Sequence, residues 1–80
     1  MSNIASTQEA ERIKRHVLHT LTAAYGESLT VDCIREHVNR ACAALLLTVD
    51  RHQLAAATET LARTAVRQDI QRSSAPQIAG

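Results

Sequence analysis

Apolar residues recur at intervals of three and four along three stretches of the chain, with short polar breaks between them. On an α-helix this spacing keeps the apolar side chains on one face, because successive residues lie about 100° apart around the axis. The pattern predicts helices over residues 7–25, 31–47 and 51–71. No alternating apolar stretch or hairpin dipeptide is present, so we expect an all-α fold, a small three-helix bundle.

The first predicted helix has signals at both ends. Ser6 and Glu9 have the spacing of a capping box, in which each side chain accepts a hydrogen bond from the other residue's backbone N–H. Gly26 follows Tyr25 and is expected to end the helix. The residues expected to face the core are Ala10, Ile13, Val17, Leu21 and Ala24.

The second predicted helix is the most regular of the three. Thr30 is a suitable N-cap, and Leu29 and Ile34 have the spacing of a hydrophobic staple across that cap. Its apolar residues follow steps of three and four, as expected for a helix that packs in a bundle. The stripe consists of Val31, Ile34, Val38, Ala41 and Leu45.

The third predicted helix is less sharply defined. Its start is placed near Asp50, yet the stretch "LLLTVD" before it holds no Gly or Pro, so one continuous helix over residues 31–71 remains an alternative. The helix carries two apolar stripes about 100° apart. The stripe expected to face the core is Leu54, Ala57, Leu61 and Ala65, and the second is Ala55, Ala62, Val66 and Ile70.

The second stripe exceeds what a three-helix monomer can bury. Leu46 and Leu47 also lie well away from the centre of the preceding helix's apolar stripe. A small protein most often covers such a surface by forming a symmetric homodimer or by docking to another protein. The residues expected at that interface are Leu46, Leu47, Ala55, Ala62, Val66 and Ile70.

Chain length and composition indicate one domain. We expect a three-helix domain over residues 6–72, a flexible leader at 1–5 and a disordered tail at 73–80 in "SSAPQIAG". The apolar fraction of 45% holds one aromatic residue, so the core must be thin. No apolar run is long enough to span a bilayer, and the N-terminus lacks the apolar segment of a signal peptide. These features favour a cytoplasmic protein with reduced thiols.

The charge balance gives little support to nucleic-acid binding. The chain has nine basic and eight acidic residues and a net charge of +1, so no strong overall electrostatic field attracts a polyanion. A small DNA-binding regulator of the helix-turn-helix kind remains the alternative function, with Arg63 and Arg67 among its basic residues. We expect the partner to be a second copy or another protein, and not nucleic acid, a membrane or a small-molecule substrate.

Two cysteines and a histidine in "SLTVDCIREHVNRACAALLL" are the main chemical candidates. Cys33 and Cys42 are nine residues apart, on opposite sides of the helix and about 13 Å apart along it, which excludes a disulfide between them. Cys33 and His37 share a face and could pair with His16 and His19 across two helices in a zinc site. The chain lacks a compact ligand knuckle, so we expect no bound metal, with half-buried thiols and solvent-facing histidines.

Recognisable catalytic motifs are missing as well. The sequence has no nucleophile elbow, no Gly-rich phosphate loop and no HExxH motif, and its acidic residues lie mostly on polar helix faces beside Arg or Lys. We therefore predict a protein that is not an enzyme, with no catalytic residue and no cofactor.

Three stretches, "LTAAYGESLT", "VDCIREHVNRACAAL" and "VDRHQLAAATETLAR", resemble the short actinobacterial three-helix bundle dimerisation domains. The resemblance covers residues 8 to about 70 and rests on apolar spacing and helix order. It implies a non-catalytic dimerisation module. Members of that group occur alone or ahead of enzymes resembling arsenate reductases and low-molecular-weight phosphatases. No catalytic domain or phosphate-binding cysteine loop is present here, so no such chemistry is transferred to Cys33 or Cys42.

Overall fold

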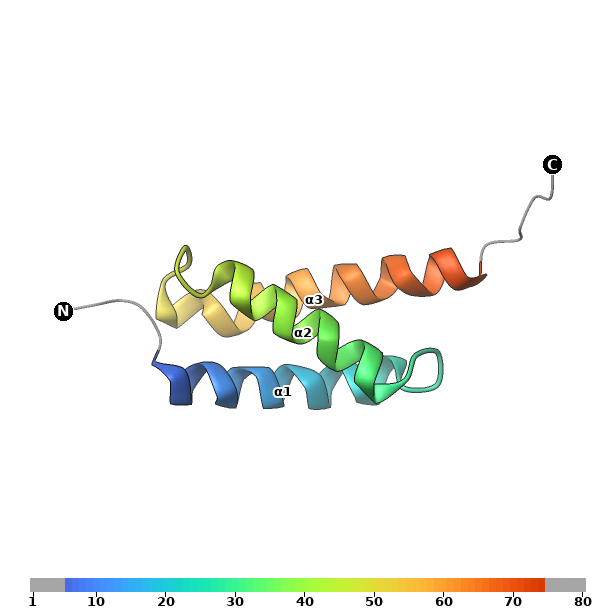
Figure 1. The fold of residues 1–80 in the computed structure, drawn as a ribbon, viewed down its shortest axis with the longest axis horizontal. Helices are drawn as coiled ribbons and strands as arrows, with labels where there is room; N and C mark the ends of the chain where they lie inside the picture. Colours follow the sequence, from blue (N-terminus) through green and yellow to red (C-terminus); the bar gives the residue numbers. More distant parts are fainter. Residues whose placement is uncertain (1–5, 75–80) are drawn as a thin grey trace.

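Residues 6–74 are described by the computed structural model, and they form three helices and no strand (Figure 1). The helices are α1 (Thr7–Tyr25), α2 (Val31–Leu45) and α3 (Arg51–Ser74). The predicted small all-α three-helix bundle is confirmed. None of these helices is both long and apolar enough to cross a membrane. The predicted leader at 1–5 and the predicted tail from 75 onward lie outside the described residues.

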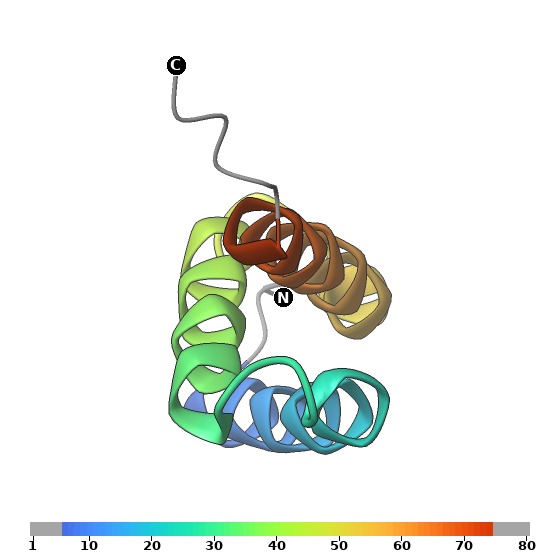
Figure 2. The ribbon, with the colours of Figure 1, turned by 90° about the vertical axis from the view of Figure 1, so that its right-hand side faces the viewer.

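The bundle is built from two roughly parallel helices joined by an oblique one. In Figure 1, α1 and α3 run in the same direction, and α2 returns between them at an angle. The end-on view of Figure 2 shows α2 along one side, with α1 below and α3 above, and each pair of helices is in contact. Because α2 runs opposite to α3, the start of α2 lies near the end of α3.

The ends of α1 follow the predicted signals with one difference. The Ser6 side chain accepts a hydrogen bond from the Glu9 backbone N–H at 3.2 Å. The Glu9 carboxylate, however, forms an ion pair with Arg51 at 3.2 Å, so it links the starts of α1 and α3. At the other end, a Cβ on Gly26 would lie 2.5 Å from the Thr22 carbonyl oxygen, which makes glycine necessary at this cap.

The chain breaks between α2 and α3, and the continuous helix is therefore excluded. Thr48 and Val49 donate backbone hydrogen bonds to the Leu45 carbonyl oxygen at 3.1 and 3.0 Å, which closes the end of α2. Asp50 then accepts a hydrogen bond from the His52 backbone N–H at 3.1 Å and starts α3. Thus α2 ends two residues before the predicted boundary. Helix α3 continues three residues beyond residue 71, so residues 73 and 74, expected in the tail, are helical.

The buried faces of α1 and α2 agree well with the predicted stripes. The core cluster takes Val17 and Leu21 from α1, and Ile34, Val38 and Ala41 from α2. Leu29 packs against this cluster, as the predicted staple requires. Two residues at the ends of the predicted stripes do not lie in the core: Ala24 is exposed near the end of α1, and Val31 is 42% exposed at the first turn of α2.

The orientation of α3 differs from the prediction. Its buried residues are Leu54, Thr58, Ala62 and Val66. Ala62 and Val66, expected on an exposed second stripe, are 0% exposed, whereas Leu61, expected in the core, is 42% exposed. The reason is geometric: a row of residues four apart drifts about 40° around the helix at each step, and such rows pack where helices cross obliquely.

Candidate functional site

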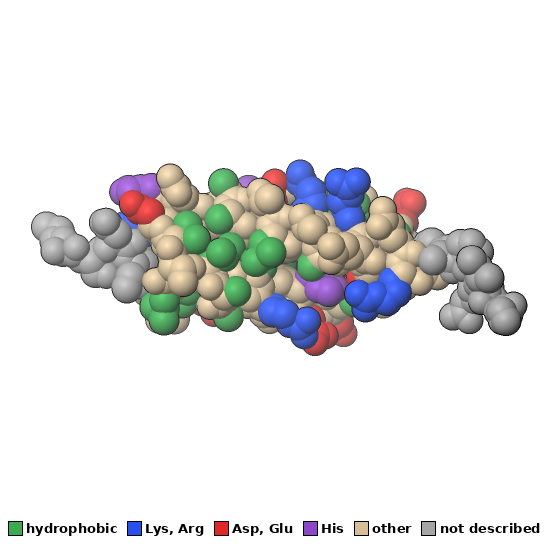
Figure 3. Space-filling view, turned by 90° about the horizontal axis from the view of Figure 1, so that it is seen from above, with side chains coloured by type: hydrophobic (Ala, Val, Ile, Leu, Met, Phe, Trp, Pro, Cys, Tyr) green, Lys and Arg blue, Asp and Glu red, His purple; other side chains and the backbone are tan. Residues whose placement is uncertain are grey.

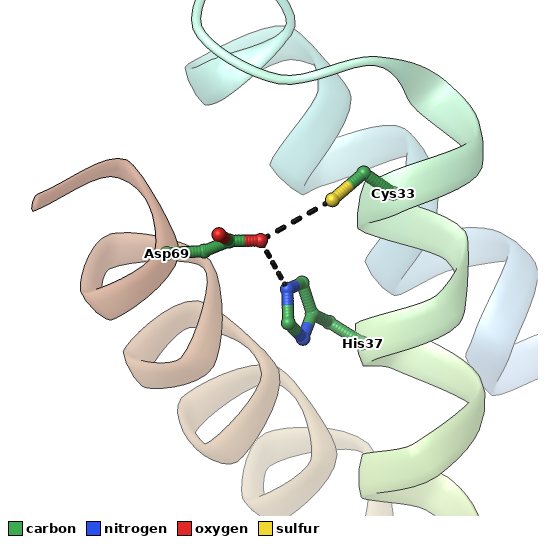
Figure 4. Close-up of side chains that lie close together, drawn as sticks. All are labelled: Cys33, His37 and Asp69. Carbon is green, nitrogen blue, oxygen red and sulfur yellow. Dashed lines mark hydrogen bonds and ion pairs between the residues drawn. The ribbon is translucent and has the colours of Figure 1, made fainter. Parts of the chain in front are cut away.

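A polar cluster joins the start of α2 to the end of α3. Thr30 caps α2 by accepting a hydrogen bond from the Cys33 backbone N–H at 3.2 Å, and the first turns of the helix carry Cys33 and His37 on one side. The Cys33 thiol and the His37 Nε2 atom both point at Asp69 on α3 (Figure 4). The Sγ atom lies 3.2 Å and Nε2 lies 2.9 Å from the same oxygen, Asp69 Oδ2.

Asp69 is the hydrogen-bond acceptor that Cys33 and His37 share. The hydrogen bond from His37 holds the pKa of Asp69 below its ordinary value, and the bond from Cys33 acts in the same direction. An ionised carboxylate only accepts hydrogen bonds, so both partners donate a hydrogen bond to it. The bond to Asp69 and the loss of solvent around the sulfur raise the pKa of the Cys33 thiol. In this arrangement Cys33 is therefore a neutral thiol.

This geometry does not match a nucleophilic cysteine. Such a cysteine needs a nearby base or positive charge that lowers its pKa. Here the carboxylate stabilises the protonated thiol, and within residues 6–74 no hydrogen bond joins Cys33 to His37. What the cluster offers is three side chains of metal-binding type, whose ligand atoms all lie within 4.8 Å of one another.

The predicted chemistry is only partly brought together. Cys33 and His37 share a face, as expected from their spacing, but His16 and His19 are exposed on α1 and take no part in the cluster. His37 is half-buried, contrary to the expectation of a solvent-facing ring. Both cysteines are free, in agreement with the excluded disulfide, and Cys42 is 2% exposed rather than half-buried.

Asp69 was missed because it lies 32 residues beyond His37 and carries no local motif. From the sequence alone, Asp69 belongs with the acidic residues expected on polar helix faces. A usable signal exists in the topology: in an antiparallel pair of helices, the start of the first lies beside the end of the second. Aligning α2 and α3 in this way places Cys33 and His37 near the last two turns of α3.

The six residues predicted at an interface fall in different environments. Ala62 and Val66 are in the core, and Ile70 is partly buried against it. Ala55 is exposed, Leu46 is half-buried, and Leu47 is 74% exposed in the turn after α2. With Ala62 and Val66 buried inside the monomer, the stripe they define does not serve as a surface for a partner.

A different apolar surface lies along α2 and α3, and we call it the α2–α3 face. Figure 3 shows hydrophobic side chains gathered toward the start of α3 and basic side chains toward its end. One hollow of this face is lined by Leu45, His52, Gln53, Ala56, Ala57, Thr60, Leu61 and Thr64. The adjoining hollow is lined by His37, Arg40, Ala41, Ala44, Leu61, Ala65, Gln68, Asp69 and Arg72. Leu61 belongs to both hollows and marks the middle of the face.

Most basic side chains on the helices are neutralised locally. Five of them form ion pairs with carboxylates at 2.8–3.3 Å. These basic residues are Lys14, Arg35, Arg40, Arg51 and Arg63. Nucleic-acid binding needs several basic groups that are available to phosphates, so these pairs do not favour the DNA-binding alternative.

Comparison of the chain with known proteins finds no relative. No family model matches the chain. No curated protein matches it. No solved structure matches it. The resemblance to the actinobacterial dimerisation domains thus stays a prediction, and the function has to be argued from the described residues themselves.

Proposed function

We propose that this protein is a non-catalytic interaction module that forms a homodimer through the α2–α3 face. The observation that carries the proposal is the position of Leu61, which is 42% exposed and lies where the two hollows meet, among small side chains such as Ala57, Ala65 and Thr64. Burying a fully exposed leucine is worth about 1.5–3 kcal/mol. Leu61 is 42% exposed, so covering it gains less than half of this, and a symmetric dimer gains it twice.

The small residues on α3 suit the approach of a second helix. Ala57, Leu61 and Ala65 form one row of residues four apart, and a neighbouring row holds Thr60 and Thr64. Rows of this kind on two helices interdigitate at a crossing angle of about −50°. Leu61 of one copy then fits between small residues of the other. The short side chains allow the two backbones to come close.

The charge distribution favours a second copy over a charged partner. The side chains of Arg40, Asp69 and Arg72 lie at one end of the face, and its middle is uncharged. In a two-fold dimer centred on Leu61, the charged end of each copy lies over the uncharged end of the other. Like charges are thereby kept apart. This arrangement also agrees with the self-association implied by the sequence resemblance.

The test is to place a charge at the centre of the face and compare it with the same change elsewhere. Val31 is a matched control, because it is also a helical apolar residue, is also 42% exposed, and does not line either hollow. Sedimentation velocity over a range of concentrations should show Leu61→Glu as a monomer. Val31→Glu should remain a dimer with an unchanged dissociation constant, expected in the micromolar range or tighter.

Two results would count against the proposal. A dimer that tolerates Leu61→Glu would place the interface on another surface. Equal dissociation of the Leu61→Glu and Val31→Glu variants would show that the added charge, and not the position, is responsible.

A further inference from the structure

We propose that Cys33, His37 and Asp69 form a binding site for Zn²⁺ with a fourth position open to solvent. The inference does not depend on the proposed dimer, because all three ligands come from one chain. The residues lie at the junction of α2 and α3, where two helices fix their relative positions (Figure 4). A thiolate, an imidazole and a carboxylate are the three side-chain ligand types that zinc uses in proteins.

Two of the three spacings between the ligand atoms are close to what a tetrahedral site requires, and the third, between Cys33 Sγ and His37 Nε2, is at most 4.8 Å. Zinc–ligand bonds of 2.0–2.3 Å place neighbouring ligand atoms about 3.4–3.6 Å apart. The Cys33 Sγ to Asp69 Oδ2 distance is 3.2 Å, and the His37 Nε2 to Asp69 Oδ2 distance is 2.9 Å. As the ion enters, the Cys33–Asp69 distance would open by about 0.2–0.4 Å and the His37–Asp69 distance by about 0.5–0.7 Å, changes within reach of side-chain rotation.

The protons and charges of the site can be accounted for. Zinc replaces the thiol proton, so the S–H bond breaks, an Sγ–Zn bond forms and one proton leaves to solvent. In the metal-free protein the Nε2–H group of His37 donates a hydrogen bond to Asp69; on zinc binding this proton leaves to solvent and Nδ1, the ring nitrogen that points away from Asp69 in Figure 4, takes up a proton from solvent, so that the lone pair of Nε2 coordinates the ion. The thiolate and the carboxylate together balance the two positive charges of the ion.

The surroundings define the open position. His37 and Asp69 line the hollow that also contains Arg40 and Arg72. The His37 side chain is 18% exposed and the Asp69 side chain is 25% exposed. An ion can therefore reach them from solvent. Glu36 adds negative charge near Cys33, and Arg72 adds positive charge near Asp69. With the two arginines beside it, the fourth position suits a water molecule or a small anion.

The sequence-based expectation of no metal rested on counting ligands from the first two helices. That count combined Cys33 and His37 with two histidines that lie elsewhere on α1, and it found no closed tetrahedron. Asp69 supplies the third ligand from α3, which removes the ground for that expectation. A site with three protein ligands and one open position also needs no local knuckle motif.

Metal titration of the reduced, metal-free protein tests the proposal. Calorimetry with Zn²⁺ should show one ion per chain, and Co²⁺ should give the visible bands of a tetrahedral site together with a thiolate-to-cobalt charge-transfer band. Cys33→Ser and Asp69→Asn should each weaken zinc affinity by at least about 100-fold. The controls His16→Gln and His19→Gln should bind zinc as the unchanged protein does, because both residues are exposed on α1 and lie outside the cluster.

Thiol protection gives a readout that needs no variant. Cys33 is half-buried and Cys42 is 2% exposed, so alkylation of the native protein by iodoacetamide should occur mainly at Cys33. Stoichiometric Zn²⁺ should slow this reaction strongly. The proposal is overturned if Zn²⁺ leaves the alkylation rate unchanged, or if Cys33→Ser and Asp69→Asn bind zinc as tightly as the two controls. In either case the three side chains only link α2 to α3 by hydrogen bonds.

Discussion

Two sides of α3 are similar in composition and differ in how deeply they are buried. One side is a row of residues four apart that lies in the core: Leu54, Thr58, Ala62 and Val66. The other is a parallel row with Ala57, Leu61 and Ala65, and its leucine is 42% exposed. Each row holds one leucine and at least one alanine, so hydropathy alone separates them poorly.

What separates the two rows is their fit to the neighbouring helices. A row of residues four apart winds about 40° around the helix at every step. The buried row packs against α1 and α2, and α2 crosses α3 obliquely, as Figure 1 shows. The β-branched side chains of Thr58 and Val66 fill the space between the helices. The exposed row keeps the same winding and is therefore shaped to receive another helix of the same kind.

The largest expected effect comes from placing a charge on the buried row. Val66→Glu should unfold the protein, because an unpaired buried carboxylate costs several kcal/mol and a small domain has only about 5 kcal/mol of stability. The same change on the exposed row, Leu61→Glu, should leave the helical circular dichroism intact. A folded Val66→Glu protein together with an unfolded Leu61→Glu protein would reverse the assignment of the two rows.

The next effect concerns the residues of α2 that pack against the buried row. Ile34→Ala should lower the free energy of unfolding by about 2–4 kcal/mol, since Ile34 is 0% exposed in the core cluster. Leu29→Ala should cost clearly less, because Leu29 is only partly buried at the edge of that cluster. Chemical denaturation measures both, and the opposite ranking would contradict the packing described for α2.

A smaller effect of opposite sign is expected at Thr58. Its hydroxyl is buried on the core row without a hydrogen-bond partner, although Cys42 lies nearby. Thr58→Val keeps the shape and removes the unsatisfied group, so it should raise the free energy of unfolding by about 1 kcal/mol. Thr60→Val on the exposed side is the control and should change little. Both are best measured in the Leu61→Glu background, where dissociation does not contribute, and a loss of stability in Thr58→Val would show that its hydroxyl is satisfied.

The smallest effect is the pH dependence of the polar cluster at the end of the helices. The pKa of Asp69 is lowered in the folded state, so its contribution to stability is complete above the unfolded pKa of about 3.9. It is lost as the pH falls through the lower folded value. Melting temperatures of the metal-free protein should therefore exceed those of Asp69→Asn at neutral pH and converge with them in acid. A constant difference down to pH 2 would contradict the assignment.

The sequence was sufficient for the elements that carry explicit local signals. Thr30 caps α2, Leu29 packs as a staple residue, and Ile34 and Val38 are buried as their spacing predicts. Such signals involve residues a few positions apart, so they can be recognised without knowing where the other helices lie. Two backbone hydrogen bonds to the Leu45 carbonyl oxygen, together with the Asp50 side chain, also explain why the chain breaks after Leu45 despite the missing Gly or Pro.

The orientation of α3 could not be obtained in the same way. Alanine is only weakly hydrophobic, so the alanines of α3 do not show which face of the helix is buried. Thr58 is buried but polar, so a pattern of apolar residues does not include it. The packing of α3 against α1 and against the oblique α2 selects the row with Ala62 and Val66 over the row with Leu61. The role of Asp69 could not be predicted for the same reason. Asp69 lies next to Cys33 only because α2 and α3 are antiparallel.

Static light scattering of the unchanged protein at ~100 µM is the most direct test of the claim that the exposed row of α3 joins two copies. The chain has a mass of 8.7 kDa, so the account predicts a measured mass of twice that value, 17.4 kDa, and a return to 8.7 kDa for Leu61→Glu. A mass of 8.7 kDa for the unchanged protein at this concentration would contradict it.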